Sequence, residues 1–285
     1  MNPGRKYPDS PLNISMKRLL LAIVFAPPVA VYFVWLLADA RSVQFLGPII
    51  SSVETEDRVV ALTFDDGPTA EFAEEILSIL RQRGVKATFF VTGREVEQNL
   101  AEARQIVAEG HELGNHSYSH PRLVLKSPSR IRQEVECTDA MIRQAGHQGE
   151  IYFRPPYGKK LFLLPWYLWS TGRTTITWNI EPESYPEVAA DARRILAHVL
   201  DRLKPGSIIL LHLMYESRAE SRKALPAIID RLHQNGYRFL TVSELLAIAE
   251  EANADRRLLS GNKHPSGLEI EAKVNASPDG ICVGG

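Results

Sequence analysis

The stretch RVVALTFDDG at residues 58–67 decides the fold, because an apolar run typical of a buried strand ends there in two aspartates and a glycine. The same arrangement returns downstream at HSYSH (116–120), RPPYG (154–158) and LLH (210–212), each of which also follows a strand-like run. Barrels of parallel strands carry their chemistry at the carboxyl ends of the strands. We therefore expect the four polar clusters to meet at one end of a parallel sheet.

Strand-like and amphipathic helical segments alternate from about residue 58 to residue 250, which is typical of parallel βα units. Seven strands are predicted, so the pattern favours an α/β fold built as a distorted (β/α) barrel of about seven strands over a complete barrel of eight. The predicted strands lie at 58–64, 86–91, 112–115, 151–153, 174–178, 207–211 and 238–240, and the predicted helices near 70–83, 95–109, 128–145, 188–203, 220–235 and 242–252.

The N-terminal region carries an apolar run from Leu19 to Leu37 without a charged residue, close to the length of about 20 residues that crosses a bilayer. Basic residues precede this run, which favours an N-terminus left in the cytoplasm. Ala38-Asp39-Ala40 resembles a small-x-small cleavage site, so a secretory signal peptide is the alternative to an uncleaved anchor. Either interpretation places the catalytic domain outside the cytoplasm, on the periplasmic or extracellular face.

Five segments are therefore expected along the chain. They are a cytoplasmic segment (1–18), a transmembrane anchor or signal peptide (19–40), a linker (41–57), a catalytic domain (58–250) and a polar, disordered tail (251–285). The net charge of −1 gives no reason to expect a nucleic-acid partner. Cys137 and Cys282 lack the spacing of a zinc or redox motif, so no role is predicted for either.

The polar clusters offer a metal site. Asp66, His116 and His120 supply one carboxylate oxygen and two imidazole nitrogens, a set that leaves a coordination position open for water. Side chains alternate along a strand, so Asp65 and Asp66 point in different directions and can hold different roles, one at a cation and the other at the water. A metal with a nearby base is sufficient for hydrolysis.

Each cluster alone has an ordinary structural explanation. Asp, Gly and Pro are favoured in turns, and a histidine such as His212 after an apolar strand can be a core residue. Arg154 before two prolines can fix a surface turn, although arginine also holds carboxylates through paired hydrogen bonds. If the clusters were only structural, four independent explanations of this kind would all have to be true at successive strand ends. A catalytic site explains all four clusters at once and is therefore favoured.

With these motifs in this order, residues 57 to 247 resemble the polysaccharide deacetylase family, also called the NodB-homology domain or carbohydrate esterase family 4. The resemblance implies a distorted (β/α) barrel and one divalent metal, commonly zinc, with cobalt, nickel or manganese as alternatives. It implies that Asp66, His116 and His120 hold the metal. It also implies that Asp65 is the general base and His212 the general acid.

The resemblance assigns further residues to the groove. Arg154 would orient Asp65, and Pro156 and Tyr157 would line the groove with the Tyr157 amide facing the oxyanion. Trp178 would also contact the substrate, and Leu210 would form part of the pocket for the acetyl methyl. The chain departs from the family in WNIEPESY (178–185), where Glu181 and Ser184 replace the expected aspartates, so Glu181 is the predicted support of His212.

The function expected from this resemblance is metal-dependent removal of N-acetyl groups from the amino sugars of an envelope glycan such as peptidoglycan, poly-N-acetylglucosamine or a chitin-like polymer. A lipid-linked sugar, a non-sugar amide and a catalytically silent glycan-binding protein are the alternatives. The insert KKLFLLPWYLW (159–169) is aromatic enough to stack on sugars or lie against lipid, although a core-facing helix is the simpler interpretation.

Overall fold

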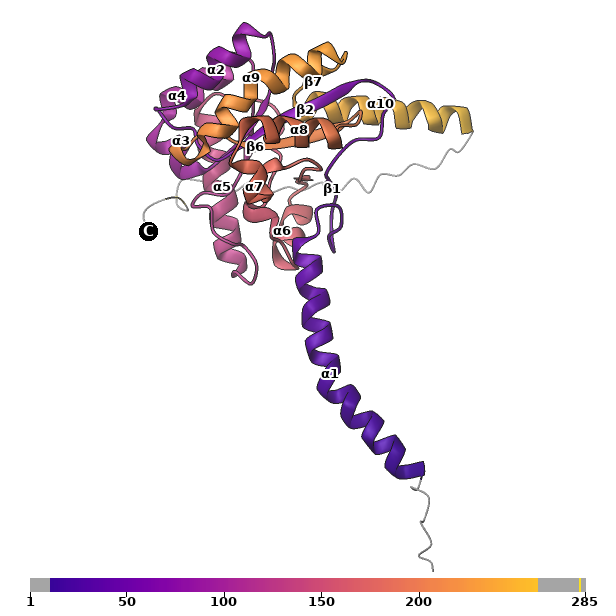
Figure 1. Cartoon of the computed structure of the whole chain (residues 1–285). Helices are drawn as coiled ribbons and strands as arrows, with labels where there is room; N and C mark the ends of the chain where they lie inside the picture. The colour runs from indigo at the N-terminus through magenta and orange to yellow at the C-terminus, as the bar shows by residue number, and fades with distance from the viewer. Residues whose placement is uncertain (1–10, 261–281, 283–285) are drawn as a thin grey trace, which may run out of the picture.

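A computed structural model describes residues 11–260 and residue 282 (Figure 1). A parallel five-stranded sheet forms its centre, in the order β4-β3-β2-β6, with β7 also paired to β2. The strands are β1 (Ile49–Ile50), β2 (Val59–Asp65), β3 (Thr88–Val91), β4 (Glu112–Asn115), β5 (Thr175–Ile176), β6 (Ser207–His212) and β7 (Arg238–Leu240). The α/β class and the parallel sheet agree with the sequence prediction.

The central strand β2 is buried along its whole length, as expected for a strand covered on both faces. Its register places Asp65 opposite Phe90 of β3 and opposite His212 of β6. Asp65 and His212, which end β2 and β6, are therefore brought to the same edge of the sheet, as the strand-end clusters predicted.

Regular pairing does not close this sheet into a barrel. The predicted strand at 151–153 is reduced to single bridges, which Phe153 makes to Asn115 and to Thr175, and another single bridge joins Ile180 to Ile209. The distorted barrel expected from the sequence is thus not confirmed.

Residues 41–57 are not a free linker, because they pack into the domain. Strand β1 pairs in parallel with β5, and the Val53 amide donates a hydrogen bond of 2.9 Å to the Gly206 carbonyl. Gly206 has a φ of +74°, and a Cβ at this position would lie 1.9 Å from the Val53 carbonyl oxygen, so only glycine allows this approach. This segment therefore contributes the buried Val53 to the core, with the half-buried Ile50 packed against it.

The helices pack around the sheet, with neighbours meeting in the series α8–α9–α2–α4 and, elsewhere, α3–α5–α6. Their bounds are α1 (Pro11–Asp39), α2 (Ala73–Gln82), α3 (Gly93–Gln98), α4 (Leu100–Ala108), α5 (Pro128–Gln144), α6 (Leu163–Ser170), α7 (Pro186–Ala189), α8 (Ala192–Arg202), α9 (Ala219–Gln234) and α10 (Val242–Ser260), with short 3-10 turns at Pro156–Gly158, Pro182–Ser184 and Glu216–Arg218. The predicted helices at 95–109 and 188–203 are each split in two.

Figure 1 shows α1 projecting from the body, which it meets at its C-terminal end. There the Lys160 amide donates to the Ala38 carbonyl at 3.0 Å, and Asp39 pairs with Lys159 at 2.6 Å. Among the helices of residues 11–260, none is both long enough and apolar enough to cross a bilayer.

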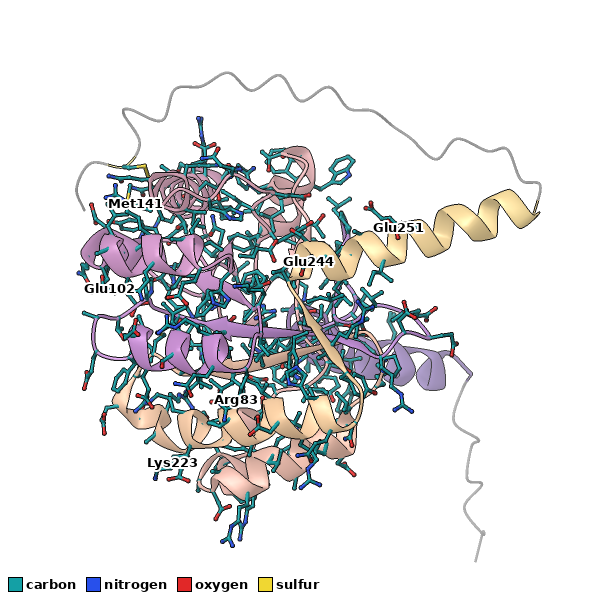
Figure 2. The ribbon with its side chains drawn as sticks, turned by 90° about the horizontal axis from the view of Figure 1, so that it is seen from above. Arg83, Glu102, Met141, Lys223, Glu244 and Glu251 are labelled. Atoms are coloured by element: carbon teal, nitrogen blue, oxygen red, sulfur yellow. A yellow bond between two sulfur atoms is a disulfide. The ribbon has the colours of Figure 1, made fainter. Side chains whose placement is uncertain are left out.

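The C-terminal part differs from the sequence prediction in two ways. Helix α10 continues to Ser260, well past the predicted domain end at residue 250. Cys282 forms a disulfide with the buried Cys137 of α5, with their Cα atoms 5.4 Å apart; Figure 2 shows this bond as the yellow link beside Met141. The two cysteines are 145 positions apart in the sequence, so no short cysteine motif could have predicted that they pair.

We expect the purified protein to contain no free thiol unless it is reduced. Non-reducing digestion should yield one cross-linked peptide that contains Cys137 and Cys282, and reduction should split it into two peptides of known mass. Mass spectrometry checks this result. A Cys282→Ser protein should lose the cross-linked peptide and expose one buried thiol that reacts only after unfolding, whereas rapid labelling of both cysteines in the native wild type would contradict the pairing.

Candidate active site

The four polar clusters meet in one pocket of about 430 Å³ at the carboxyl edge of the sheet. The predicted site residues Asp65, Asp66, Leu210 and His212 enter it from the ends of β2 and β6. The complete lining is Asp39, Arg41, Asp65, Asp66, His116, His120, Tyr157, Gly158, Trp178, Glu181, Ser184, Leu210, His212 and Arg218.

Asp66, His116 and His120 form the predicted three-ligand group, with their donor atoms all within 4.8 Å of one another. His116 Nε2 lies 3.2 Å from His120 Nε2, which in turn lies 3.6 Å from Asp66 Oδ1. The His116 Nδ1–H donates to the Arg154 carbonyl at 2.8 Å, so the lone pair on Nε2 faces the other two donors. Two nitrogens and one carboxylate oxygen are a donor set suited to zinc and similar divalent metals.

Electrostatics also fit a cation at this position. Burial lowers the pKa of His116 to about 3, which keeps the imidazole neutral, as a metal ligand must be. Burial also raises the pKa of Asp66, against the opposing effect of His212 and His120. A cation would favour the ionised form of this carboxyl group. The residues present therefore fit a divalent metal, and Asp66, His116 and His120 would hold it.

The backbone around this group is held in an uncommon conformation. Among the described residues, five that are not glycine have positive φ, and four of these are Asp66 (73°), Ser117 (65°), His120 (54°) and Tyr157 (58°). Local hydrogen bonds hold the turn, since the Ser117 amide donates to Asn115 Oδ1 and the His120 amide to Ser117 Oγ. Such conformations cost free energy and cluster at functional sites.

Asp65 is buried beside the fully buried Arg154. The guanidinium donates from Nη1 to Asp65 Oδ1 at 2.6 Å and to Thr63 Oγ1 at 2.9 Å, and it stacks on the Phe90 ring at 3.8 Å. Burial alone would raise the pKa of Asp65, but the charges of Arg154, His116 and His212 outweigh it and hold the pKa below its usual value. Asp65 therefore remains ionised, as a proton acceptor must be.

His212 is held by Glu183, and the predicted support from Glu181 is wrong. His212 Nδ1 lies 2.5 Å from Glu183 Oε2, which also accepts from the His212 amide at 2.9 Å. The other Glu183 oxygen accepts from the Ser221 hydroxyl. Pro182 begins a short 3-10 turn, which directs the second glutamate of WNIEPESY toward β6. The only indication of this role in the sequence was the presence of a second glutamate, Glu183, two residues after Glu181.

Glu181 instead joins the pocket wall to the N-terminal segment. Its Oε2 accepts from Arg41 at 2.7 Å, from Trp178 Nε1 at 2.9 Å and from Ser184 Oγ at 2.5 Å. The Thr177 hydroxyl donates to the Arg41 carbonyl at 2.5 Å. Arg41 was assigned to a linker by the sequence, yet it lines the pocket.

The other predicted groove residues lie around the same opening. Leu210 and Trp178 are buried in the pocket wall, and Tyr157 is half exposed at its rim, where its ring lies 4.6 Å from that of His120. Pro156 is buried in the short 3-10 turn and is not among the residues that line the pocket.

The electrostatics of His212 predict a pH dependence. Burial lowers its pKa, but the hydrogen bond and charge of Glu183, with the charges of Asp65 and Asp66, raise it to about 9. A proton donor is active below its pKa, so turnover should be retained at neutral pH and fall as the pH rises through that value. Glu183→Gln should move this alkaline limb down by about 1–2 pH units.

A profile of kcat against pH checks this prediction. Glu181→Gln is the matched control, because Glu181 belongs to the same loop but is hydrogen-bonded to Trp178, whereas His212 is hydrogen-bonded to Glu183. Its alkaline limb should stay where the wild type has it. An unshifted limb in Glu183→Gln, or an equal shift in both variants, would contradict the assignment of Glu183 as the positioning residue.

Comparison with known proteins agrees with this geometry. The sequence model of the family described as polysaccharide deacetylase matches residues 52–174. A peptidoglycan-N-acetylglucosamine deacetylase of Bacillus cereus is 35% identical over 195 residues, which cover 67% of this chain and 70% of the relative. The chain belongs to the polysaccharide deacetylase family, the NodB-homology domain of carbohydrate esterase family 4.

Other members are similar at the same level. A chitooligosaccharide deacetylase of Bradyrhizobium sp. is 32% identical, covering 66% of this chain and 90% of the relative. Among solved structures, a peptidoglycan N-acetylglucosamine deacetylase in complex with 4-naphthalen-1-yl-N-oxidanyl-benzamide has a TM-score of 0.64 at 34% identity, covering 68% of this chain and 91% of that one. A pseudoenzyme of the family from Bacillus anthracis has a TM-score of 0.63 at 30% identity, covering 71% and 69%.

Proposed function

We propose that this polysaccharide deacetylase removes N-acetyl groups from the amino sugars of an envelope glycan by metal-assisted hydrolysis. The observation that carries the proposal is the joint presence, in one pocket, of a metal-binding group, an ionised carboxylate held by Arg154 and a histidine held by Glu183. Relatives named as deacetylases of peptidoglycan and of chitooligosaccharides support an acetylated glycan as the substrate.

Each of the chain's own groups has a distinct task in this proposal. A divalent ion, with zinc as the first candidate, would lower the pKa of a water and polarise the acetyl carbonyl. Asp65 accepts the proton of the attacking water, since its pKa keeps it ionised. Arg154 holds Asp65 in place, and the Tyr157 amide donates to the developing oxyanion.

His212 acts as the proton donor in this proposal. Its Nδ1–H is engaged by Glu183, so Nε2 is the atom that donates a proton to the departing amine. The amine leaves only when protonated, and the raised pKa of His212 keeps that proton available at neutral pH. Leu210, buried in the pocket wall, contacts the acetyl methyl.

We also propose that the enzyme works outside the cytoplasm, either held at the membrane by its N-terminal segment or released after cleavage. Two observations support this proposal. The apolar run Leu19–Leu37 follows basic residues, and the Cys137–Cys282 disulfide is a bond that persists in oxidising compartments.

A silent glycan-binding role is a second candidate, because solved relatives include pseudoenzymes of the same family. In this chain the proposed metal ligands, base and acid all converge on the pocket. An active enzyme is therefore the proposal that accounts for more of these residues.

The substrate class is tested by incubating the full-length protein, loaded with zinc, with three acetylated compounds and measuring released acetate. We expect release from chitooligosaccharides or peptidoglycan strands, and no release from an N-acetylated peptide. Release from the peptide alone would indicate a non-sugar amidase. Binding of the glycans without any release would indicate the silent role.

A further inference from the structure

Two arginines line the catalytic pocket, and they differ in their partners. Arg41 is paired with Glu181 at 2.7 Å. Arg218, at the end of the short turn before α9, makes no side-chain hydrogen bond or ion pair with any residue that the structure describes. Its Nε is buried without a partner, although unpartnered buried N–H groups are rare and costly.

The acidic side chains around the pocket are already engaged. Asp39 pairs with Lys159 at 2.6 Å and Glu181 with Arg41. The remaining acids are used within the catalytic group itself, where Asp65 pairs with Arg154, Asp66 faces His120, and Glu183 holds His212. None of these carboxylates is available as the counter-ion of Arg218.

We infer that Arg218 binds an anionic group of the substrate, a carboxylate or phosphate carried near the acetylated sugar. The inference rests on the proposed deacetylase function and narrows its substrate class. A guanidinium presents a planar fork of donors that matches both oxyanions, and its charge cannot be removed by titration at physiological pH. A neutral glycan would leave the charge of Arg218 without a counter-ion.

Two sources can supply this anion in an acetylated envelope glycan. One is a carboxylate on a sugar of the glycan strand, and the other is the phosphate that joins a sugar to a lipid carrier. The test therefore uses a glycan strand with free carboxylates beside the same strand with those groups methyl-esterified. It also uses N-acetylglucosamine joined through phosphate to a lipid chain, beside a neutral alkyl glycoside of the same sugar.

The full-length wild type, Arg218→Gln and Arg218→Lys are compared on all four compounds, with zinc present. Arg218→Gln should raise KM at least about tenfold for the anionic compound of one pair, and leave kcat and the KM for its neutral partner unchanged. Arg218→Lys should retain part of the affinity, because the charge remains without the fork. Arg193→Gln, a change at an exposed position of α8 outside the pocket, should have no effect.

Comparison with Arg41→Gln separates anion binding from damage to the pocket wall. Removing the Arg41–Glu181 pair should affect charged and neutral compounds alike, because it loosens the wall that both would contact. The pair of compounds that responds to Arg218→Gln identifies the source of the anion. Equal effects of Arg218→Gln on charged and neutral compounds, or no effect on any of them, would overturn the inference.

Binding by calorimetry keeps the two proposals separate. If the wild type releases no acetate from any compound, the proposed activity fails. The dissociation constants of wild type and Arg218→Gln for the charged and neutral compounds still test the anion contact in that case. A selective loss of affinity for the charged member of a pair supports it, and unchanged affinity overturns it.

Discussion

Asp65→Asn is expected to lower kcat for acetate release by about 10²–10⁴-fold, the usual contribution of a positioned general base. The asparagine keeps the size of the side chain but cannot accept the proton of the attacking water. Its effect should appear in kcat at saturating glycan, because Asp65 is not one of the three proposed metal ligands. Steady-state kinetics with zinc bound at one equivalent measures it.

Glu112→Gln is the matched control for this change. Glu112 is also a buried carboxylate with several hydrogen bonds, but it lies at the start of β4 and does not line the pocket. The control should lose some stability and keep its kcat. If folded, zinc-loaded Asp65→Asn retained activity within about tenfold of the wild type, Asp65 would not be the base.

Arg154→Met is expected to destabilise the folded protein by about 3–5 kcal/mol at neutral pH, because it leaves the Asp65 carboxylate buried without its counter-ion. Methionine fills much of the volume beside Phe90, so the loss is chiefly electrostatic. Urea unfolding followed by circular dichroism measures the free energy of unfolding.

The pH dependence of this loss follows from the pKa of Asp65. In the wild type that pKa is lowered, so the pair contributes stability above the ordinary pKa of an aspartate, and this contribution is lost as the pH falls through the lowered value. In Arg154→Met the buried carboxyl group has a raised pKa, so its penalty shrinks on acidification. The gap between the two proteins should narrow from pH 7 to pH 4, and a constant gap would show that packing dominates.

The strand-end residues of the site could be predicted from the sequence for a physical reason. Residues that end neighbouring parallel strands must share an edge of the sheet, and the register of β2 and β6 places Asp65 opposite His212. The proposed metal ligands His116 and His120 follow β4 in the same way. The place of the polar clusters at strand ends therefore predicted that Asp65, Asp66, His116, His120 and His212 lie together in one pocket.

The parts that could not be predicted depend on loops and on distant pairings. The difference between Glu181 and Glu183 is decided by the turn that begins at Pro182, and a sequence pattern does not specify which of two nearby carboxylates turns inward. Arg41 meets Glu181 across 140 positions, within a segment that has the composition of a linker. Hydrophobic periodicity predicts local secondary structure, whereas the contact between Arg41 and Glu181 joins residues that are far apart in the sequence.

The most direct test of the account is acetate release from chitooligosaccharides and peptidoglycan by the full-length protein before and after its metal is removed. Chelation and dialysis give the stripped protein, and elemental analysis confirms that no metal remains. We expect release to disappear with the metal and to return when one equivalent of zinc is added to the site of Asp66, His116 and His120. Undiminished release by the metal-free protein would contradict the account.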